Sequence, residues 1–270
     1  MKFVVVLIVC LIIGECVWYF MPRNYLDIRL VDVGQGDCIF IETNNRKKIL
    51  VDGGGSETYD VGKNILLPYL LDMRVMCVDT IISSHSDADH LYGLITVLEN
   101  LKVNRVIVAK NALGYERVYE IAKEKNIDVI EVLKGDVIQI GDITLEVLSP
   151  DKNIGNSDVN DYSLVVKLVY GGSSMLLTGD ISQGVEKNLY NVEADILKVA
   201  HHGSISSSDE GFVKRVNPEV SIIGVGEDNK YGHPAAEVLE RLRRTSKVYT
   251  TAEYGEITIK MYKNWIKVIK

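Results

Sequence analysis

The five histidines of this 270-residue chain gather in three places. His85 and His90 lie close together, His201 and His202 are neighbours, and His233 follows in a third polar loop. Each of these places comes after an apolar run with the composition of a β-strand. Histidines with purely structural roles would be scattered, whereas loops at strand ends are where α/β proteins place their sites. The distribution therefore predicts an α/β chain with a polar site built from strand ends.

Predicted strands and helices alternate along the chain. Residues 26–33, 38–43 and 48–51 are short β-rich runs, and residues 163–170 and 174–178 form a predicted hairpin with a Gly-Gly turn. Strands in blocks, with helices between them, indicate two sheets flanked by helices. The hairpins at both ends of the chain argue against a single parallel doubly wound sheet.

The first histidine cluster reads His-Ser-Asp-Ala-Asp-His and offers four ligands within six residues: His85, Asp87, Asp89 and His90. Imidazole and carboxylate together suit Zn²⁺ or a harder cation such as Mn²⁺. The alternative is a polar loop that caps the helix expected to start near Leu91, with one aspartate as the cap. Capping needs one carboxylate and does not explain two of them between two histidines.

Three further features follow predicted strands. Asp180 ends a strand in Leu-Thr-Gly-Asp, where a carboxylate can bridge two metal ions or cap a helix. His201 and His202 end another strand in His-His-Gly-Ser. His233 lies in a polar loop that opens a helix, with Pro234 near its first turn. Each feature is weak alone, and together they indicate a metal centre.

In this combination the chain resembles the metallo-β-lactamase superfamily, whose metal motif usually reads His-x-His-x-Asp-His. It resembles more closely the extracytoplasmic hydrolase domain of ComEC-type DNA-uptake proteins. The resemblance covers residues 26–260 and implies an α/β (α+β) fold, an αββα sandwich with its site along one edge of the paired sheets. The matching segments, in the family's order, are residues 32–37, 50–54, 85–90, 160–164, 177–180, 201–204 and 231–234.

The resemblance also implies a binuclear centre of two divalent metal ions, Zn or Mn. One ion would take His85 and Asp87, the other Asp89, His90 and His201, with Asp180 bridging them. Asp87 stands where the superfamily usually has histidine, and no histidine occurs between residues 90 and 201. Asn160, Asp161 or water would complete the coordination shell of the first ion, which His85 and Asp87 hold. Its oxygen-rich shell moves the preference from Zn²⁺ towards Mn²⁺.

Two divalent metal ions about 3.5–4 Å apart activate water for attack on a phosphodiester. Asp89 and His233 are the candidate catalytic residues, and His233 would bind the phosphate or protonate the leaving oxygen. A purely structural role for His202 stays open. The candidate substrate-binding residues are Asn160, Ser163, His202, Ser204, Asn229 and Tyr231.

Three functions compete. The first is a phosphodiesterase or nuclease that acts on DNA, single-stranded DNA included, outside the cytoplasm. The second is a phosphodiesterase for a cell-wall or small-molecule phosphoester, such as phosphorylcholine on teichoic acid. The third is a non-catalytic binding module, which the intact set of ligands disfavours. A β-lactamase is disfavoured because those enzymes lack the Tyr-Gly-His-Pro loop at 231–234. No protein partner is inferred.

The net charge of −7 excludes a broad basic field for scanning nucleic acid. A local basic groove stays open, and a solvated helix face is the alternative for the same side chains. The candidates are Lys214, Arg215, Lys230, Arg241, Arg243 and Arg244.

Residues 3–21 form an apolar stretch whose only charged residue is Glu15, and nineteen residues nearly span a bilayer core. Trp18 and Tyr19 fit an interfacial aromatic belt, and Lys2 favours a cytoplasmic amino end. We expect a transmembrane signal anchor at 1–22 and a hydrolase domain at 24–270. The alternatives are a cleaved signal peptide and a lipoprotein signal at Cys16.

The anchor predicts a single-pass protein of the cell membrane with an extracytoplasmic catalytic domain, or a secreted protein if the segment is cleaved. ComEC-type proteins have a large multi-span channel, whereas at most one span is expected here. The expectation is therefore a stand-alone relative of the hydrolase domain.

Overall fold

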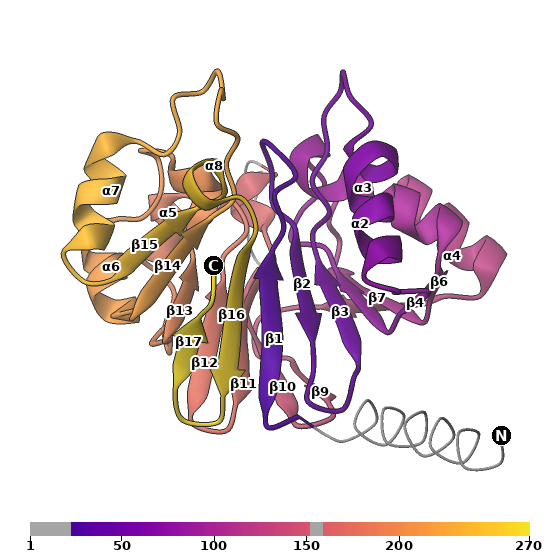
Figure 1. Ribbon diagram of the computed structural model, residues 1–270, viewed down its shortest axis with the longest axis horizontal. Helices are drawn as coiled ribbons and strands as arrows, with labels where there is room; N and C mark the ends of the chain where they lie inside the picture. Colours follow the sequence, from indigo (N-terminus) through magenta and orange to yellow (C-terminus); the bar gives the residue numbers. More distant parts are fainter. Residues whose placement is uncertain (1–22, 152–158) are drawn as a thin grey trace, which may run out of the picture.

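The computed structural model describes residues 23–151 and 159–270. Two β-sheets pack face to face, and helices cover the outer face of each sheet (Figure 1). This arrangement confirms the predicted αββα sandwich. The predicted membrane anchor at 1–22 lies outside the described residues. Among the helices of the described ranges, none is long and apolar enough to cross a bilayer.

The first sheet has eight strands and is antiparallel at one side and parallel at the other. Strands β17, β16, β1, β2 and β3 pair antiparallel, and β3, β5, β7 and β8 pair parallel. In order across the sheet, the strands are β17 (Ile266–Val268), β16 (Ile257–Tyr262), β1 (Tyr25–Leu30), β2 (Ile39–Glu42), β3 (Lys48–Val51), β5 (Thr80–Ile82), β7 (Arg105–Ala109) and β8 (Asp128–Val132).

The second sheet has seven strands and the same mixed character. Strands β9 to β12 pair antiparallel, and β12 to β15 pair parallel. The predicted Gly-Gly hairpin is confirmed as β11 and β12. The order is β15 (Lys247–Thr250), β14 (Val220–Ile223), β13 (Ile196–Lys198), β12 (Ser173–Leu177), β11 (Val165–Tyr170), β10 (Ile143–Ser149) and β9 (Val137–Ile140). A separate pair joins β4 (Cys77–Val78) and β6 (Lys102–Val103).

The helices and helical turns connect the strands. On the first sheet lie η1 (Gly62–Leu66, a π-helix), α2 (Leu67–Asp72), α3 (Ala88–Asn100) and α4 (Glu116–Lys125). On the second lie α5 (Gln183–Glu186), α6 (Glu210–Val216) and α7 (Ala236–Arg243). Short elements near the sheet ends are η2 (Asn160–Tyr162), η3 (Ala200–Gly203) and α8 (Thr251–Tyr254).

The main core lies between the two sheets. Strand β10 alternates buried and half-buried residues, as a strand with one face in a core does. Its Ile143, Leu145 and Val147 join side chains from the first sheet, such as Ile28 and Ile259, in one buried cluster. A second hydrophobic cluster lies between the first sheet and its helices, and a third lies between the second sheet and its helices. These layers fix the relative positions of the strand ends, where the polar clusters lie.

Helix α3 begins at Ala88, three residues before the predicted start. Asp89 and His90 therefore lie on its first turn and are held by regular helical geometry. Asp87 occupies the N-cap position, but its side chain makes no capping hydrogen bond. The alternative that the Asp87 side chain caps this helix is therefore wrong.

Two glycines let α3 approach the loop after β3. The Gly93 amide donates to the Gly54 carbonyl at 2.9 Å, and the Gly53 amide donates to the His90 carbonyl at 2.8 Å. A Cβ at Gly93 would lie 1.9 Å from the Gly53 carbonyl oxygen. Any side chain there would push the helix, and His90 with it, away from the strand ends.

We expect Gly93→Ala to destabilise the fold by at least about 2 kcal/mol, because the new methyl group meets rigid backbone. Gly184→Ala in α5 is the matched control. Its Cβ would meet only the Ser182 Oγ, at 3.3 Å, so its free energy of unfolding should change little. Urea denaturation of both variants checks the difference, and equal stabilities would contradict the close-approach argument.

Candidate metal centre

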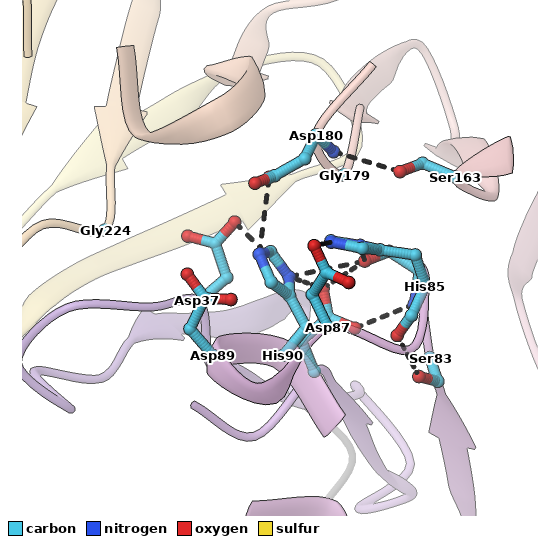
Figure 2. Close-up of polar contacts among 12 residues, drawn as sticks. Asp37, Ser83, His85, Asp87, Asp89, His90, Ser163, Gly179, Asp180 and Gly224 are labelled. Atoms are coloured by element: carbon cyan, nitrogen blue, oxygen red, sulfur yellow. Dashed lines mark hydrogen bonds and ion pairs between the residues drawn. The ribbon is translucent and has the colours of Figure 1, made fainter. Parts of the chain in front are cut away.

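The polar clusters of the sequence meet at one edge of the sandwich. His85 follows β5, and Asp180 and His202 follow β12 and β13. Leu177 and Lys198 pair in the parallel register of β12 and β13, so these two strands end at the same level. Figure 2 shows the side chains of the first cluster pointing towards Asp180 from the other sheet.

Four buried residues bring ligand atoms within 4.8 Å of one another: Asp37, His90, Asp180 and His202. They come from four separate segments. Asp37 lies in the loop between β1 and β2, and His90 lies on α3. The group unites both sheets, so it can form only when the sandwich is complete.

Asp180 faces the Nε2 atoms of two histidines. Its Oδ1 lies 3.3 Å from His90 Nε2, and its Oδ2 lies 3.5 Å from His202 Nε2. Asp89 approaches the same side, with its Oδ2 3.2 Å from His202 Nε2. Two carboxylates and two imidazoles therefore converge on one small volume.

His85 and Asp87 lie next to this group. The His85 side chain is buried, and its ring centroid lies 4.1 Å from that of His90. Its Nε2 lies 3.7 Å from Asp87 Oδ2. The side chains of Asp87 and Asp89 are 47% and 33% exposed, whereas that of Asp180 is 4% exposed. The two exposed carboxylates therefore mark the open side of the centre.

The Nδ1 atoms of His85 and His90 form hydrogen bonds on the side of each ring that faces away from Asp180. Asp52 accepts a hydrogen bond from His90 Nδ1 at 3.0 Å and another from the Ser84 hydroxyl at 2.7 Å. Because the Ser84 proton is used in this way, its Oγ accepts from His85 Nδ1 at 2.9 Å. Each ring therefore carries a proton on Nδ1, so Nε2 is the atom that can bind a metal ion.

His202 is held in the same way. Its Nδ1 lies 2.8 Å from the Gly224 carbonyl oxygen, which can only accept. Nδ1 therefore carries a proton, and Nε2 faces Asp180 and Asp89. Three histidines thus use Nδ1 for a supporting hydrogen bond and keep Nε2 as the atom that can bind a metal ion.

The atoms that line this space fit a cation. Within the described ranges, the Nε2 atoms of His85, His90 and His202 and the Oδ1 of Asp180 are buried without a hydrogen-bond partner. Leaving a buried polar atom unpaired costs about 1–3 kcal/mol. Imidazole Nε2 and carboxylate oxygen are the donors that Zn²⁺ and Mn²⁺ take, so divalent ions bound here would give these atoms the partners that they lack.

The charges point the same way. Burial alone would lower the pKa of His202, but Asp180 and Asp37 raise it to about 10. The same balance raises the pKa of His90 well above its usual value, through Asp180 and Asp52. Burial, with the neighbouring His90, lowers the pKa of His85 to about 3. The carboxylates therefore favour positive charge at His90 and His202, which a divalent ion can supply in place of a ring proton.

Asp37 differs from Asp180 because it faces the Nδ1 side of the rings. Its oxygens lie 3.6 Å from His202 Nδ1 and 3.9 Å from His90 Nδ1. Its charge is already compensated, since the buried Lys198 ammonium forms an ion pair with it. Burial would raise the pKa of Asp37, but Lys198 and His202 hold it at about 2. Asp37 therefore lies on the Nδ1 side of the His90 and His202 rings, and Asp180 lies on the Nε2 side, where an ion would bind.

His201 lies outside this group. It is half-buried, and its ring lies edge-on to that of His233, with centroids 5.9 Å apart. His201 and His202 both adopt left-handed backbone conformations, with φ of 51°. This turn sends the two neighbouring side chains in different directions. The resemblance predicted His201 as the ligand, whereas the structure brings His202 to the cluster.

His233 and Tyr231 form a rim beside His201. Their rings stack with centroids 6.0 Å apart, and the Tyr231 side chain is 59% exposed. Asn229 shapes this loop, because it donates to the His233 carbonyl at 2.6 Å and accepts from the His233 amide at 2.9 Å. Burial and the neighbouring His201 lower the pKa of His233. The ring is therefore neutral at physiological pH.

The remaining predicted substrate-binding residues have mixed surroundings. Ser163 is buried, and its Oγ accepts from the Asp180 amide at 3.1 Å, so it positions Asp180. Ser204 is buried and pairs with the Ser206 hydroxyl at 2.9 Å. The Asn160 Oδ1 is buried without a partner among the described residues, whereas Asp161 accepts from the Ser182 amide at 3.1 Å. Of the two, Asn160 has the free oxygen.

The candidate basic groove has carboxylate and carbonyl partners. Lys214 pairs with Glu210 at 2.8 Å, and Arg244 pairs with Glu240 at 2.6 Å. Arg215 donates to the Glu186 carbonyl at 2.7 Å. These contacts favour the solvated helix face over a nucleic-acid groove.

The family follows from the match to known sequences. Residues 31–227 match the metallo-beta-lactamase superfamily, and the chain belongs to it. Fold and site together define a metallo-β-lactamase-fold hydrolase with a candidate site for divalent metal ions.

Among individual proteins, the chain is similar to competence-related ones. It is 35% identical to ComE operon protein 3 of Bacillus subtilis over 88% of this chain and 33% of that protein. It is 30% identical to competence protein ComA of Neisseria gonorrhoeae over 83% of this chain and 30% of that protein. The chain thus spans about a third of the length of these relatives.

A solved structure shows the same fold. The metallo-beta-lactamase fold protein YhfI from Bacillus subtilis superposes with a TM-score of 0.59, over 91% of this chain and 100% of that one. At 12% identity, this likeness concerns the fold alone.

We expect His202→Ala to lower divalent-metal content sharply, because it removes a buried Nε2 that faces Asp180. His201→Ala is the matched control on the neighbouring residue, and it should keep the wild-type metal content. Elemental analysis after gentle dialysis against Mn²⁺ or Zn²⁺ compares the two. The reverse order would make His201 the ligand.

We expect Lys198→Met to destabilise the protein by about 3–5 kcal/mol, because it leaves Asp37 as an uncompensated buried charge. The double variant Asp37→Asn/Lys198→Met removes both charges and should recover part of that loss. Denaturant unfolding of the metal-free proteins measures both effects. A double variant less stable than Lys198→Met would show that the pair is not the cause.

Proposed function

We propose that this chain is a binuclear metal-dependent phosphodiesterase that acts on DNA outside the cytoplasm, tethered by residues 1–22. The observation that carries the catalytic part is the convergence of the His90 and His202 Nε2 atoms on Asp180, with the buried Nε2 of His85 beside them. Such a set has no use in a packed core and suits a pair of divalent ions.

The proposed ligands fall into two groups that share Asp180. His85 and Asp87 would hold one ion, and the Asn160 Oδ1, which has no hydrogen-bond partner among the described residues, would be a further ligand to it. Asp89, His90 and His202 would hold the other, with His202 in the place that the sequence analysis gave to His201. Asp180 offers two oxygens from one strand end, so it can bind both ions.

Bound divalent ions would neutralise phosphoryl oxygens and lower the pKa of water at the site. The chain's own residues complete the chemistry. Asp89 lies on the half-exposed side, where it can orient the attacking water. His233 stands on the rim as a neutral ring, so its N–H can donate a hydrogen bond to a phosphate oxygen. It could protonate the leaving oxygen only after it has accepted a proton, which the attacking water would supply.

Two observations support DNA as the substrate. The relatives at 35% and 30% identity are named as a ComE operon protein and a competence protein. The exposed Tyr231 ring, stacked on His233, offers a platform on which an unpaired base can stack. Single-stranded DNA fits this rim better than a duplex, whose bases are already stacked on one another.

We expect the full chain in detergent with Mn²⁺ to cleave a single-stranded oligonucleotide. Asp180→Ala should abolish cleavage, because the two cations would lose their shared anionic ligand and repel each other. Turnover is measured on labelled DNA and on a chromogenic phosphodiester. Cleavage of the chromogenic ester alone would favour a cell-wall or small-molecule phosphoester, and no turnover with full metal occupancy would contradict the proposal.

We expect His233→Ala to keep its metal content and to lower kcat by about 10²–10⁴-fold, the usual range for a lost general acid or base. Tyr231→Phe is the matched rim control, since it keeps the stacking ring. Parallel assays of metal content and rate separate the roles. Loss of metal together with activity would make His233 a ligand.

A further inference from the structure

The edge opposite the metal centre gathers four turns around the start of β1. Tyr25 pairs with Tyr262 at the end of β16, and the Arg23 amide donates to the Asn44 carbonyl at 2.9 Å. We call this surface the turn face. It consists of residues 23–25, 43–47, 141–142, 171–172 and 263–265.

Contacts between the turns show that the turn face is one continuous surface. Asn44 donates through its side chain to Asp142 at 2.9 Å, which joins the second and third segments. The Gly172 amide donates to the Lys263 carbonyl at 2.5 Å, which joins the last two. A pocket of about 420 Å³ opens among them, beside Arg23, Tyr170 and Trp265.

Aromatic rings dominate this pocket. Tyr262 and Trp265 stack with centroids 3.9 Å apart and 8° between their planes, and Tyr25 lies 5.4 Å from Tyr262. Trp265 is nevertheless 52% exposed. Stacking fixes the indole in place at the surface, where it is available to an apolar or interfacial environment.

Cations surround the rings. Lys260 Nζ lies 4.7 Å from the centroid of Tyr25, and Lys263 Nζ lies 5.7 Å from that of Tyr170. The turn face carries four basic residues, Arg23, Arg46, Lys47 and Lys263, and one acidic residue, Asp142, which gives +3 on a chain of −7. Outside the turn face, Glu42 pairs with Arg23 and Arg46, and Asp79 pairs with Lys47. Lys263 and the neighbouring Lys260, which lie beside the rings, therefore contribute most to the attraction.

The sequence just before Arg23 indicates what lies against the turn face. The apolar stretch 3–21 ends two residues before Arg23, which lines the pocket. A bilayer that holds this stretch must therefore come within a few residues of the turn face. Exposed Trp and Tyr with flanking Lys are the side chains that favour a membrane interface, and basic residues favour anionic headgroups.

We propose that the turn face docks on the headgroup region of an anionic phospholipid bilayer, with Trp265 at the interface. This proposal rests on the membrane tether of the proposed function, and it adds a fixed orientation. Strand β1 runs from Tyr25 at the turn face to Leu30 beside the loop that carries Asp37. Six residues of strand span about 20 Å, so the metal centre opens away from the membrane.

Tryptophan quenching tests the docking directly. The chain has two tryptophans, so Trp18→Phe leaves Trp265 as the sole emitter. The full chain is reconstituted into vesicles of phosphatidylcholine and phosphatidylglycerol, with bromine near the headgroup end of the acyl chains. We expect a large loss of Trp265 emission and a blue shift relative to unbrominated vesicles. The control Trp18→Phe/Trp265→Phe/Leu113→Trp places the sole emitter on the exposed Leu113 position, where emission should not change.

The outcomes separate the claims. Lys260→Glu/Lys263→Glu in the Trp18→Phe background should restore emission, and so should vesicles of phosphatidylcholine alone. Unquenched Trp265 in a chain that co-floats with vesicles would overturn the docking and leave the tether standing. A chain that does not co-float would overturn both the tether and the docking. DNA cleavage in detergent tests the catalytic proposal independently.

Discussion

The structure depends on a buried set of imidazoles and carboxylates that neither sheet could hold alone. His90 and Asp180 approach from opposite sheets to 3.3 Å, and His202 joins them from the strand next to Asp180. Burying charged and polar groups without partners is costly, so the arrangement needs a compensating cation. The close approach of α3 at Gly93 follows from the same need, since it sets the position of the first turn and of His90.

The rings of the histidines divide the site into two sides. On the Nδ1 side, Asp52 and the Gly224 carbonyl fix the ring orientations, and Lys198 compensates the charge of Asp37. On the Nε2 side, Asp180 has no basic residue of comparable closeness among the described residues. The asymmetry between Asp37 and Asp180 indicates where a cation binds, because Lys198 already pairs with Asp37 and no lysine or arginine pairs with Asp180 among the described residues.

The sequence predicted the layered fold and most of the site because strand ends and polar clusters are visible in residue order. Two features were not visible. The choice between His201 and His202 depends on left-handed backbone at two non-glycine residues, which no pattern signals. Asp37 belonged to a matching segment but received no role, since its pairing with Lys198 joins residues 161 positions apart, and neither has a metal-site spacing. The metal identity and the substrate stay predictions, as does the membrane anchor.

Crystallography of the metal-loaded protein, with anomalous diffraction at the metal edge, tests the central claim most directly. The account predicts anomalous peaks about 2.0–2.2 Å from the Nε2 atoms of His90 and His202, with Asp180 as a shared ligand. A peak bound by His201, or an empty space between the three Nε2 atoms at saturating metal, would contradict it.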